Sequence, residues 1–308
     1  MKRDIVQDIG SKEEMSLIRF KARDRFSVSS LLVTRKYEKL RDILAVPIVI
    51  QIPGLLGHFL ARGTPRLLPH ELAARGVSSL TINTRLAYAG QIVGTGIFDD
   101  TIHDIDVAVE FLTISGFENI YILGYSLGAS MLVHWASKRE NKNVKGLILE
   151  GSHYSIPDSW KKDFDKWGSS PTYDEVYQRA KEILGPDPYN SPNDETFIVY
   201  QSRGPTREPI NSEIFTYKTW WHMAGPEAYN AMAYKNMHKV PYPVLMVRGD
   251  GDFLVEDWEP DKLASIAHEA GNKHVHVRHI ENARHDCMEN TPEFLKEIHQ
   301  LFSHFTIE

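Results

Sequence analysis

The sequence predicts an α/β protein: a mostly parallel central sheet with helices on both faces. Short runs rich in Val, Ile and Leu recur along the chain, and the distance between most of them leaves room for a helix. Several of these runs are apolar at every position, which is typical of strands buried on both faces. The stretches between them carry apolar residues at helical spacing.

The predicted elements follow in chain order. Residues 16–34 alternate around a polar Arg-Asp-Arg turn and predict two antiparallel strands. The later strands share a continuous apolar run and are expected at residues 46–52, 77–83, 119–124, 144–151, 243–249 and 273–280. The helices share 3.6-residue periodicity and are expected at residues 65–76, 99–112, 127–138, 261–271 and 291–305. Gly76 supplies the stop for the first helix.

One stretch interrupts this alternation. Residues 154–241 contain no convincing core strand, and they hold 15 of the chain's 32 aromatic residues. Short helical pieces are broken by Gly- and Pro-containing segments. We therefore expect a core made of residues 1–153 and 242–308, with residues 154–241 inserted before the penultimate core strand as a mostly helical cap subdomain.

Composition excludes several classes of function. The net charge of −6 and a pI of about 6.2 argue against nucleic acid as the main partner, because its binding needs basic patches. No run approaches the ~20 apolar residues that span a membrane. The charged N-terminus lacks a signal core, and Cys287 is the single cysteine, so we expect a cytoplasmic protein without an intrachain disulfide. The sequence does not determine the oligomeric state, and a homodimer is one of the options.

A serine stands between two glycines where a strand is expected to meet a helix. The stretch Gly124-Tyr125-Ser126-Leu127-Gly128 ends the apolar run 119–124 and begins the helical run. A nucleophile exposed by so sharp a turn needs close backbone packing, and glycine on either side permits it. The free N–H groups at the start of the helix would face the site. The alternative is an ordinary turn between strand and helix.

A serine nucleophile needs a base, and the base needs a carboxylate to orient it. His285 lies in Ala-Arg-His-Asp, after the last expected strand and before the closing helix. Two acids follow the strand 243–249 in Gly-Asp-Gly-Asp. We favour Asp252, because the glycines carry it farther over the sheet edge; Asp250 is the second choice and Glu150 the third.

The order Ser126, Asp252, His285, together with Gly-Tyr-Ser-Leu-Gly-Ala, Arg-Gly-Asp-Gly-Asp and Ala-Arg-His-Asp, resembles the α/β-hydrolase superfamily over nearly the whole chain. The resemblance implies that fold, a catalytic triad, and a lid at residues 154–241. It also implies an oxyanion hole, which we assign to the backbone N–H groups of Leu127 and Leu55. Many relatives have His-Gly where this chain has Pro53-Gly54.

Other side chains are candidates for binding. Four are expected to contact substrate: Arg85, Tyr88, Trp220 and Trp221. Three histidines of one predicted strand invite a metal site: His274, His276 and His279. No acid or cysteine pattern completes such a site, so we expect no metal and no organic cofactor.

These observations predict a serine hydrolase that cleaves a carboxylic ester through an acyl-enzyme. The aromatic-rich insertion favours a small, apolar or aromatic acyl substrate. The same triad would also serve a thioesterase, an amidase or a hydrolase of carbon–carbon bonds. Outside the enzymes, the fold can act as a ligand-binding protein.

Overall fold

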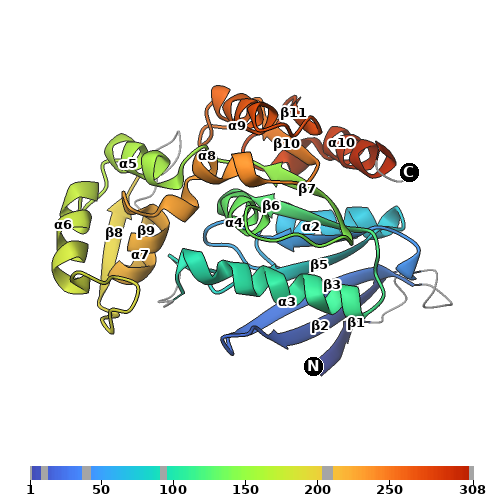
Figure 1. Cartoon of the computed structure of the whole chain (residues 1–308), viewed down its shortest axis with the longest axis horizontal. Helices are drawn as coiled ribbons and strands as arrows, with labels where there is room; N and C mark the ends of the chain where they lie inside the picture. The colour runs from blue at the N-terminus through green and yellow to red at the C-terminus, as the bar shows by residue number, and fades with distance from the viewer. Residues whose placement is uncertain (1, 8–12, 37–42, 91–95, 203–210, 305–308) are drawn as a thin grey trace.

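A twisted sheet forms the centre of the molecule (Figure 1). The computed structural model describes residues 2–7, 13–36, 43–90, 96–202 and 211–304, and all structural statements concern these residues. The sheet has nine described strands in the order β1-β2-β3-β5-β4-β6-β7-β10-β11. Their bounds are β1 (Lys2–Gln7), β2 (Glu13–Lys21), β3 (Ser27–Arg35), β4 (Ile48–Ile52), β5 (Ser78–Asn83), β6 (Ile120–Tyr125), β7 (Val144–Glu150), β10 (Val244–Gly249) and β11 (Val275–Ile280).

The strand directions confirm a mostly parallel sheet. From β5 to β11 neighbouring strands run parallel, while β1, β2 and β3 form an antiparallel edge that joins β5. The chain leaves β4 toward β5 on one side and returns to β6 on the other. Ligands bind beyond the carboxyl ends of the strands at such a reversal. The residues that follow β4 and β6 therefore lie at the expected site.

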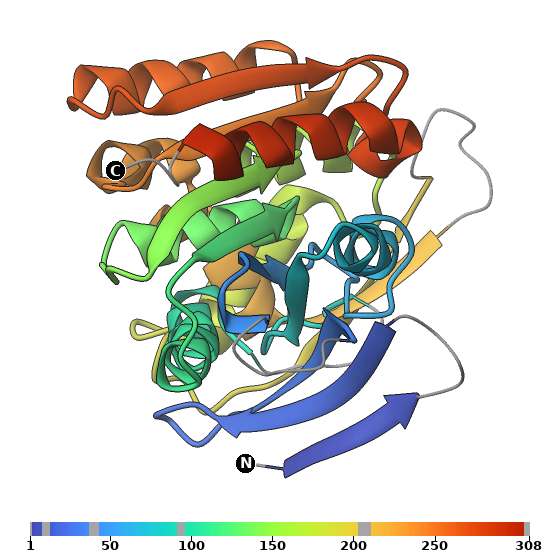
Figure 2. The same cartoon turned by 90° about the vertical axis from the view of Figure 1, so that its right-hand side faces the viewer.

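Helices cover both faces of the sheet, as predicted. Figure 2 shows α2 (Thr64–Ala74) and α10 (Thr291–His304) on one face and α3 (Thr101–Ile114) and α9 (Trp258–Glu269) on the other. The second face also holds α4 (Leu127–Ala136), which packs between β6 and α3. Short helices η1 (Phe98–Asp100) and η4 (Cys287–Asn290) precede α3 and α10.

The pleat of each strand divides the core between these two layers. Ile48, Ile50 and Ile52 of β4 pack into the cluster that contains α3, α4 and α9, whereas Val49 packs with α2 and α10. All four side chains are fully buried. A strand buried on both faces reads as a continuous apolar run, which is why the sequence revealed it.

Residues 154–241, called the inserted segment below, lie between β7 and β10. They contain α5 (Ile156–Lys166), α6 (Tyr173–Leu184), β8 (Thr196–Gln201), β9 (Asn211–Thr216), α7 (Tyr217–Ala224), η2 (Tyr229–Ala231), α8 (Ala233–Asn236) and η3 (Met237–Lys239). Helices α5, α6 and α7 and strands β8 and β9 form one end of the molecule, while α8 and η3 pack against α4 and α9 (Figure 1). Residues 203–210 lie outside the described part. The strands β8 and β9 pair with each other in a separate sheet, so they join no core strand.

No helix in the described ranges is both long and apolar enough to cross a membrane.

Candidate active site

Ser126 occupies a strained turn between β6 and α4. Its φ of 55° and ψ of −121° lie in a region that residues with a side chain rarely adopt. The two glycines permit this turn: a Cβ on Gly124 would lie 2.4 Å from the carbonyl oxygen of Gly128, and a Cβ on Gly128 would lie 2.1 Å from that of Ile52. The chain therefore packs too closely for any larger residue at either position, as a nucleophile elbow requires.

The structure brings His285 and Asp252 together. Nδ1 of His285 lies 2.8 Å from Oδ2 of Asp252, while Oδ1 of Asp252 accepts the backbone N–H groups of Leu254 at 2.8 Å and Val255 at 3.2 Å. Burial alone would raise the pKa of Asp252, but the hydrogen bonds from His285, Leu254 and Val255 hold it below its usual range. Asp252 is thus a carboxylate that orients the His285 ring.

The two other candidate acids lie elsewhere. Asp250 is exposed, and its backbone N–H bonds to the carbonyl of Ile280 in the neighbouring strand. Glu150 ends β7, and its carboxyl bonds to Thr64 and to the backbone N–H of Cys287 instead of His285.

His285 and Ser126 share one cavity. The Nε2 atom of His285 is buried and has no hydrogen-bond partner among the described residues, and both side chains line a cavity of about 210 Å³. Gly151 makes room for the ring, because a Cβ there would lie 2.8 Å from Cε1 of His285. Gly151 was not among the predicted site residues; its position directly after a core strand was the available signal.

Both expected oxyanion donors lie at this cavity. Leu127 begins α4, and Leu55 follows β4 on the loop that starts with Pro53-Gly54. Gly54 packs against the nucleophile, since a Cβ there would lie 2.8 Å from Cβ of Ser126. The loop thus approaches Ser126 closely enough to present a backbone N–H to a bound substrate.

One face of α5 closes the cavity from the side of the inserted segment. Ile156, Trp160 and Asp163 of this helix line the cavity at helical spacing, together with Trp167 directly after the helix. The helix is fixed at its start by Ser155, whose side chain accepts the N–H of Asp158. The remaining wall comes from His153, Tyr125 and Leu254. The helical spacing of Ile156, Trp160 and Trp167 was the feature of the sequence that could have identified this wall of the cavity.

The four expected substrate contacts lie outside this cavity. Arg85 is buried, and its guanidinium pairs with Asp24, Asp100 and Asp104 at 2.7 Å, 3.4 Å and 2.8 Å. Three acids around one cation explain why Arg85 faces them rather than the cleft.

The three aromatic candidates have packing partners of their own. Tyr88 stacks on His58, and Trp221 stacks on Tyr177. Trp220 is fully buried in the core of the inserted segment. None of the three lines the cavity that contains Ser126.

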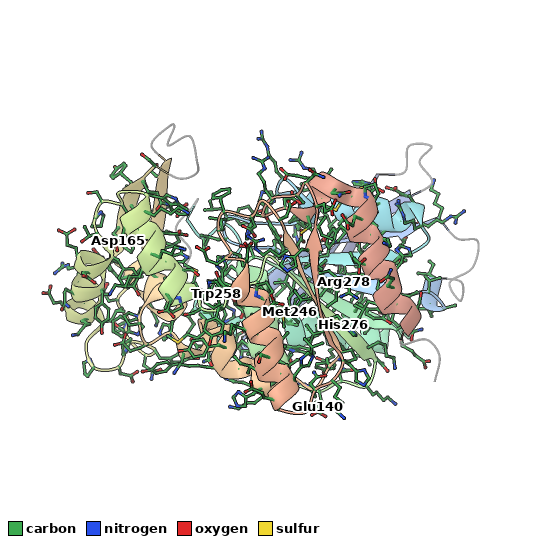
Figure 3. The ribbon with its side chains drawn as sticks, turned by 90° about the horizontal axis from the view of Figure 1, so that it is seen from above. Glu140, Asp165, Met246, Trp258, His276 and Arg278 are labelled. Atoms are coloured by element: carbon green, nitrogen blue, oxygen red, sulfur yellow. The ribbon has the colours of Figure 1, made fainter. Side chains whose placement is uncertain are left out.

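The three histidines proposed as metal candidates share an exposed position. His274, His276 and His279 lie on or beside β11, at the edge of the sheet. Figure 3 labels His276 and Arg278 well to the right of Asp165, which lies in the inserted segment. The described part of the chain contains no group of His, Cys, Asp and Glu residues arranged to hold a metal ion.

Comparison with solved structures agrees with this fold. The esterase Pf2001 of Pyrococcus furiosus is 14% identical, with a TM-score of 0.62 over 95% of this chain and 90% of that chain. Est1E of Butyrivibrio proteoclasticus is 17% identical, with a TM-score of 0.58 over 92% of this chain and 97% of that chain. The monoacylglycerol lipase of Paleococcus ferrophilus is 18% identical, with a TM-score of 0.58 over 84% and 96% of the two chains.

The sequence itself identifies the family. No curated protein matches it. The family model described as serine aminopeptidase, S33, matches residues 71–292, which is well over half of the chain and includes the elbow, the acid and the histidine. The chain therefore belongs to the serine aminopeptidase S33 family of the α/β-hydrolase superfamily.

Proposed function

We propose that the protein hydrolyses the carboxylic ester of a small, largely apolar acyl substrate through an acyl-enzyme on Ser126. The observation that carries this proposal is one cavity that holds a serine on a strained elbow and a histidine bonded to a buried carboxylate. The names of the three structural relatives, two esterases and a monoacylglycerol lipase, support ester chemistry.

Each side chain has a role in the reaction. Nε2 of His285 accepts the hydroxyl proton as Ser126 attacks the acyl carbonyl, and then donates that proton to the leaving alkoxide. Asp252 stabilises the imidazolium formed in between. Water, activated by the same histidine, then releases the acid from Ser126.

The oxyanion of each tetrahedral intermediate is held by the backbone N–H groups of Leu127 and Leu55. Each donor of this kind contributes about 3 kcal/mol to transition-state stabilisation. Leu127 also stands at the N-terminus of α4, where the helix dipole favours negative charge.

The cavity suggests a short acyl group. Its volume of about 210 Å³ is below the ~300 Å³ at which pockets for drug-sized ligands begin. Ile156, Trp160 and Trp167 give it an apolar wall. We therefore propose that residues 154–241 act as a cap over a core of residues 1–153 and 242–308, and that α5 sets the acyl preference.

The free thiol of Cys287 is buried, and no other cysteine occurs in the chain. This usage is common in reducing compartments. We propose the cytoplasm as the place of action and a small molecule as the substrate.

The test is hydrolysis of p-nitrophenyl esters of increasing acyl length by the wild type and by Ser126→Ala, with circular dichroism to check folding. We expect turnover of short acyl esters by the wild type alone. Turnover that persists in folded Ser126→Ala would contradict the proposal. A matched p-nitroanilide and a thioester distinguish amidase and thioesterase activity, and ligand binding without turnover would favour a binding protein.

A further inference from the structure

A second carboxyl group lies behind the catalytic residues and takes no part in the triad. Glu150, the last residue of β7, is fully buried. Its Oε1 atom lies 2.8 Å from Oγ1 of Thr64 and 3.0 Å from the backbone nitrogen of Cys287. Its Oε2 atom is buried and has no hydrogen-bond partner among the described residues.

The hydroxyl of Thr64 is shared between two acids. Oγ1 of Thr64 lies 2.8 Å from Oε1 of Glu150 and 3.0 Å from Oδ1 of Asp286. A hydroxyl carries one proton, so it donates to one of the two oxygens and must accept at the other. If both acids were ionised, the Thr64 oxygen would face one carboxylate oxygen with no proton between them. Two full hydrogen bonds at Thr64 therefore require a proton on one of the two carboxyl groups.

The surroundings identify which acid that is. Asp286 is partly exposed, and its Oδ1 atom also accepts the N–H of Met288. Its Oδ2 atom lies beside Gly63 at the start of α2, where a helix favours an anion. Glu150 has no such exposure, and an ionised Oε2 would be a buried charge without a donor. The proton belongs on Glu150.

Of the other titratable groups around Glu150, only the Cys287 thiol supports its anion, through a side-chain hydrogen bond, and burial with the nearby acids outweighs it. Burial first, and Asp286 second, raise the pKa of Glu150 to about 8 against the hydrogen bonds from Thr64 and Cys287. Burial raises the pKa of the Cys287 thiol well above its usual value, and that of Tyr125, on the neighbouring strand, is raised in the same direction. Asp252, which raises the pKa of both groups, is a further anion nearby.

This hydrogen-bonded group is continuous with the catalytic residues. Asp286 and Cys287 directly follow His285, so their bonds to Thr64 and Glu150 fix the loop that carries the base. The backbone carbonyl of Glu150 accepts the N–H of Ser126 at 2.8 Å. The next residue, Gly151, packs against the His285 ring. One end of β7 thus contacts both the nucleophile and the base.

We propose that Glu150 is a neutral carboxylic acid at pH 7 and acts as a positioning residue. Its Oε1–H donates to Thr64, and Thr64 donates to Asp286, so that the start of α2, the end of β7 and the His285 loop are joined by one chain of hydrogen bonds. At higher pH Glu150 loses its proton, Thr64 can then donate to only one of the two acids, and the loop keeps the bond from Cys287 but loses one link of the chain.

The kinetic consequence rests on the proposed function, because it assumes that His285 is the base. Thr64→Val removes the shared hydroxyl at nearly constant volume, and we expect kcat to fall about tenfold with KM unchanged. Thr64→Ser restores a hydroxyl and serves as the matched control, with most of kcat recovered. Equal rates in the wild type and Thr64→Val would overturn the positioning role.

The protonation state itself is tested by infrared difference spectroscopy, which needs no turnover. At pH 7 the wild type minus Glu150→Gln spectrum should contain the carbonyl band of a protonated carboxylic acid, and the band should disappear as the pH rises through about 8. A difference spectrum with carboxylate bands alone at pH 7 would overturn the proposal, whatever the enzyme hydrolyses.

If Glu150→Gln fails to fold, the same band is followed in the two Thr64 variants. The proposal predicts that Thr64→Val shifts the carbonyl band of Glu150, because the O–H of Glu150 loses its acceptor. Thr64→Ser keeps that acceptor and should leave the band in place. A band that does not move in folded Thr64→Val would contradict the assignment to Glu150.

Discussion

Two carboxyl groups at the ends of the neighbouring strands β7 and β10 are held in opposite charge states. Asp252 accepts one bond from His285 and two from backbone N–H groups, so each of its two oxygens has at least one donor. Glu150 accepts one backbone N–H, from Cys287, shares the hydroxyl of Thr64 with a second acid, and leaves its Oε2 atom without a hydrogen-bond partner among the described residues. Burial acts on both groups in the same direction, and the number of donors decides which of them stays ionised.

The comparison assigns different work to the two acids. In the proposed reaction, an ionised Asp252 stabilises the positive charge that His285 acquires. A neutral Glu150 adds no charge to the site and instead holds the loop in place. Substituting each acid by its amide should therefore give very different losses.

The largest predicted effect is the difference in kcat between the two amide variants, Asp252→Asn and Glu150→Gln. Asp252→Asn removes the negative charge and allows the wrong tautomer of His285, so we expect kcat to fall by about 10⁴-fold. Glu150→Gln stays neutral and loses one hydrogen bond of the chain, so we expect a loss of less than about tenfold at pH 7. Steady-state kinetics on one ester measures both. Similar losses in the two folded variants would remove the distinction.

A smaller loss of kcat is predicted for a substitution at the end of β7, where the chain packs against His285. Gly151→Ala places a Cβ 2.8 Å from Cε1 of His285, too close for the ring to stay where it is, and a displaced base costs on the order of 10²-fold in kcat. Gly185→Ala is the matched control, because Gly185 also has positive φ but has no atom near the added Cβ. Both variants should lose stability from the positive φ, and Gly151→Ala alone should lose activity. Full activity in Gly151→Ala would mean that the ring can move without consequence.

The pH dependence of unfolding gives the two acids opposite signs. The pKa of Glu150 rises from 4.5 to about 8 on folding, so the folded state retains a proton that the unfolded chain releases. Its contribution makes stability fall between pH 4.5 and about 8, by about 1.4 kcal/mol per pH unit. Asp252 has a lowered pKa, so its contribution is present above the unfolded value of 3.8 and is lost as the pH falls.

Urea unfolding of the wild type and Glu150→Gln between pH 5 and pH 9 measures this slope. The free energy of unfolding of Glu150→Gln should fall less with rising pH than that of the wild type. The two curves should therefore approach or cross each other as the pH rises. Parallel curves would show that Glu150 ionises alike in the folded and unfolded states.

The smallest predicted effect concerns the neighbouring acid. Asp250 is exposed on the same turn as Asp252 but has no bond to His285. Asp250→Asn should therefore change kcat/KM by less than about twofold, as surface substitutions generally do. A large loss would indicate that charge anywhere in the turn matters, rather than the bond to the ring.

Much of this arrangement was predictable because local rules and the fold agree. Two glycines at the end of a strand indicate the elbow around Ser126. Asp252 and His285 follow later strands in the expected order. The helix α6 begins and ends with clear signals, a capping box at Thr172 and Glu175 and a glycine at Gly185.

The misses have physical reasons as well. Arg85 follows a core strand, which favours the cleft, but three acids from distant segments pair with it instead. β1 is too charged to read as a strand, and its pairing with β2 overrides its composition. β8 alternates buried and exposed residues, a two-residue period that was masked by its helical neighbours. The contacts of Thr64 with Glu150 and with Asp286 join residues 86 and 222 positions apart, which no local pattern reveals.

The central claim is that Ser126, activated by His285, attacks the substrate. The most direct test is reaction with a fluorophosphonate, followed by intact-mass measurement and peptide mapping of the wild type, Ser126→Ala and Asp252→Asn. The account predicts one label per chain on Ser126, none on the alanine variant and much slower labelling of the asparagine variant. A label on another residue, or no label on a folded wild type that hydrolyses esters, would contradict it.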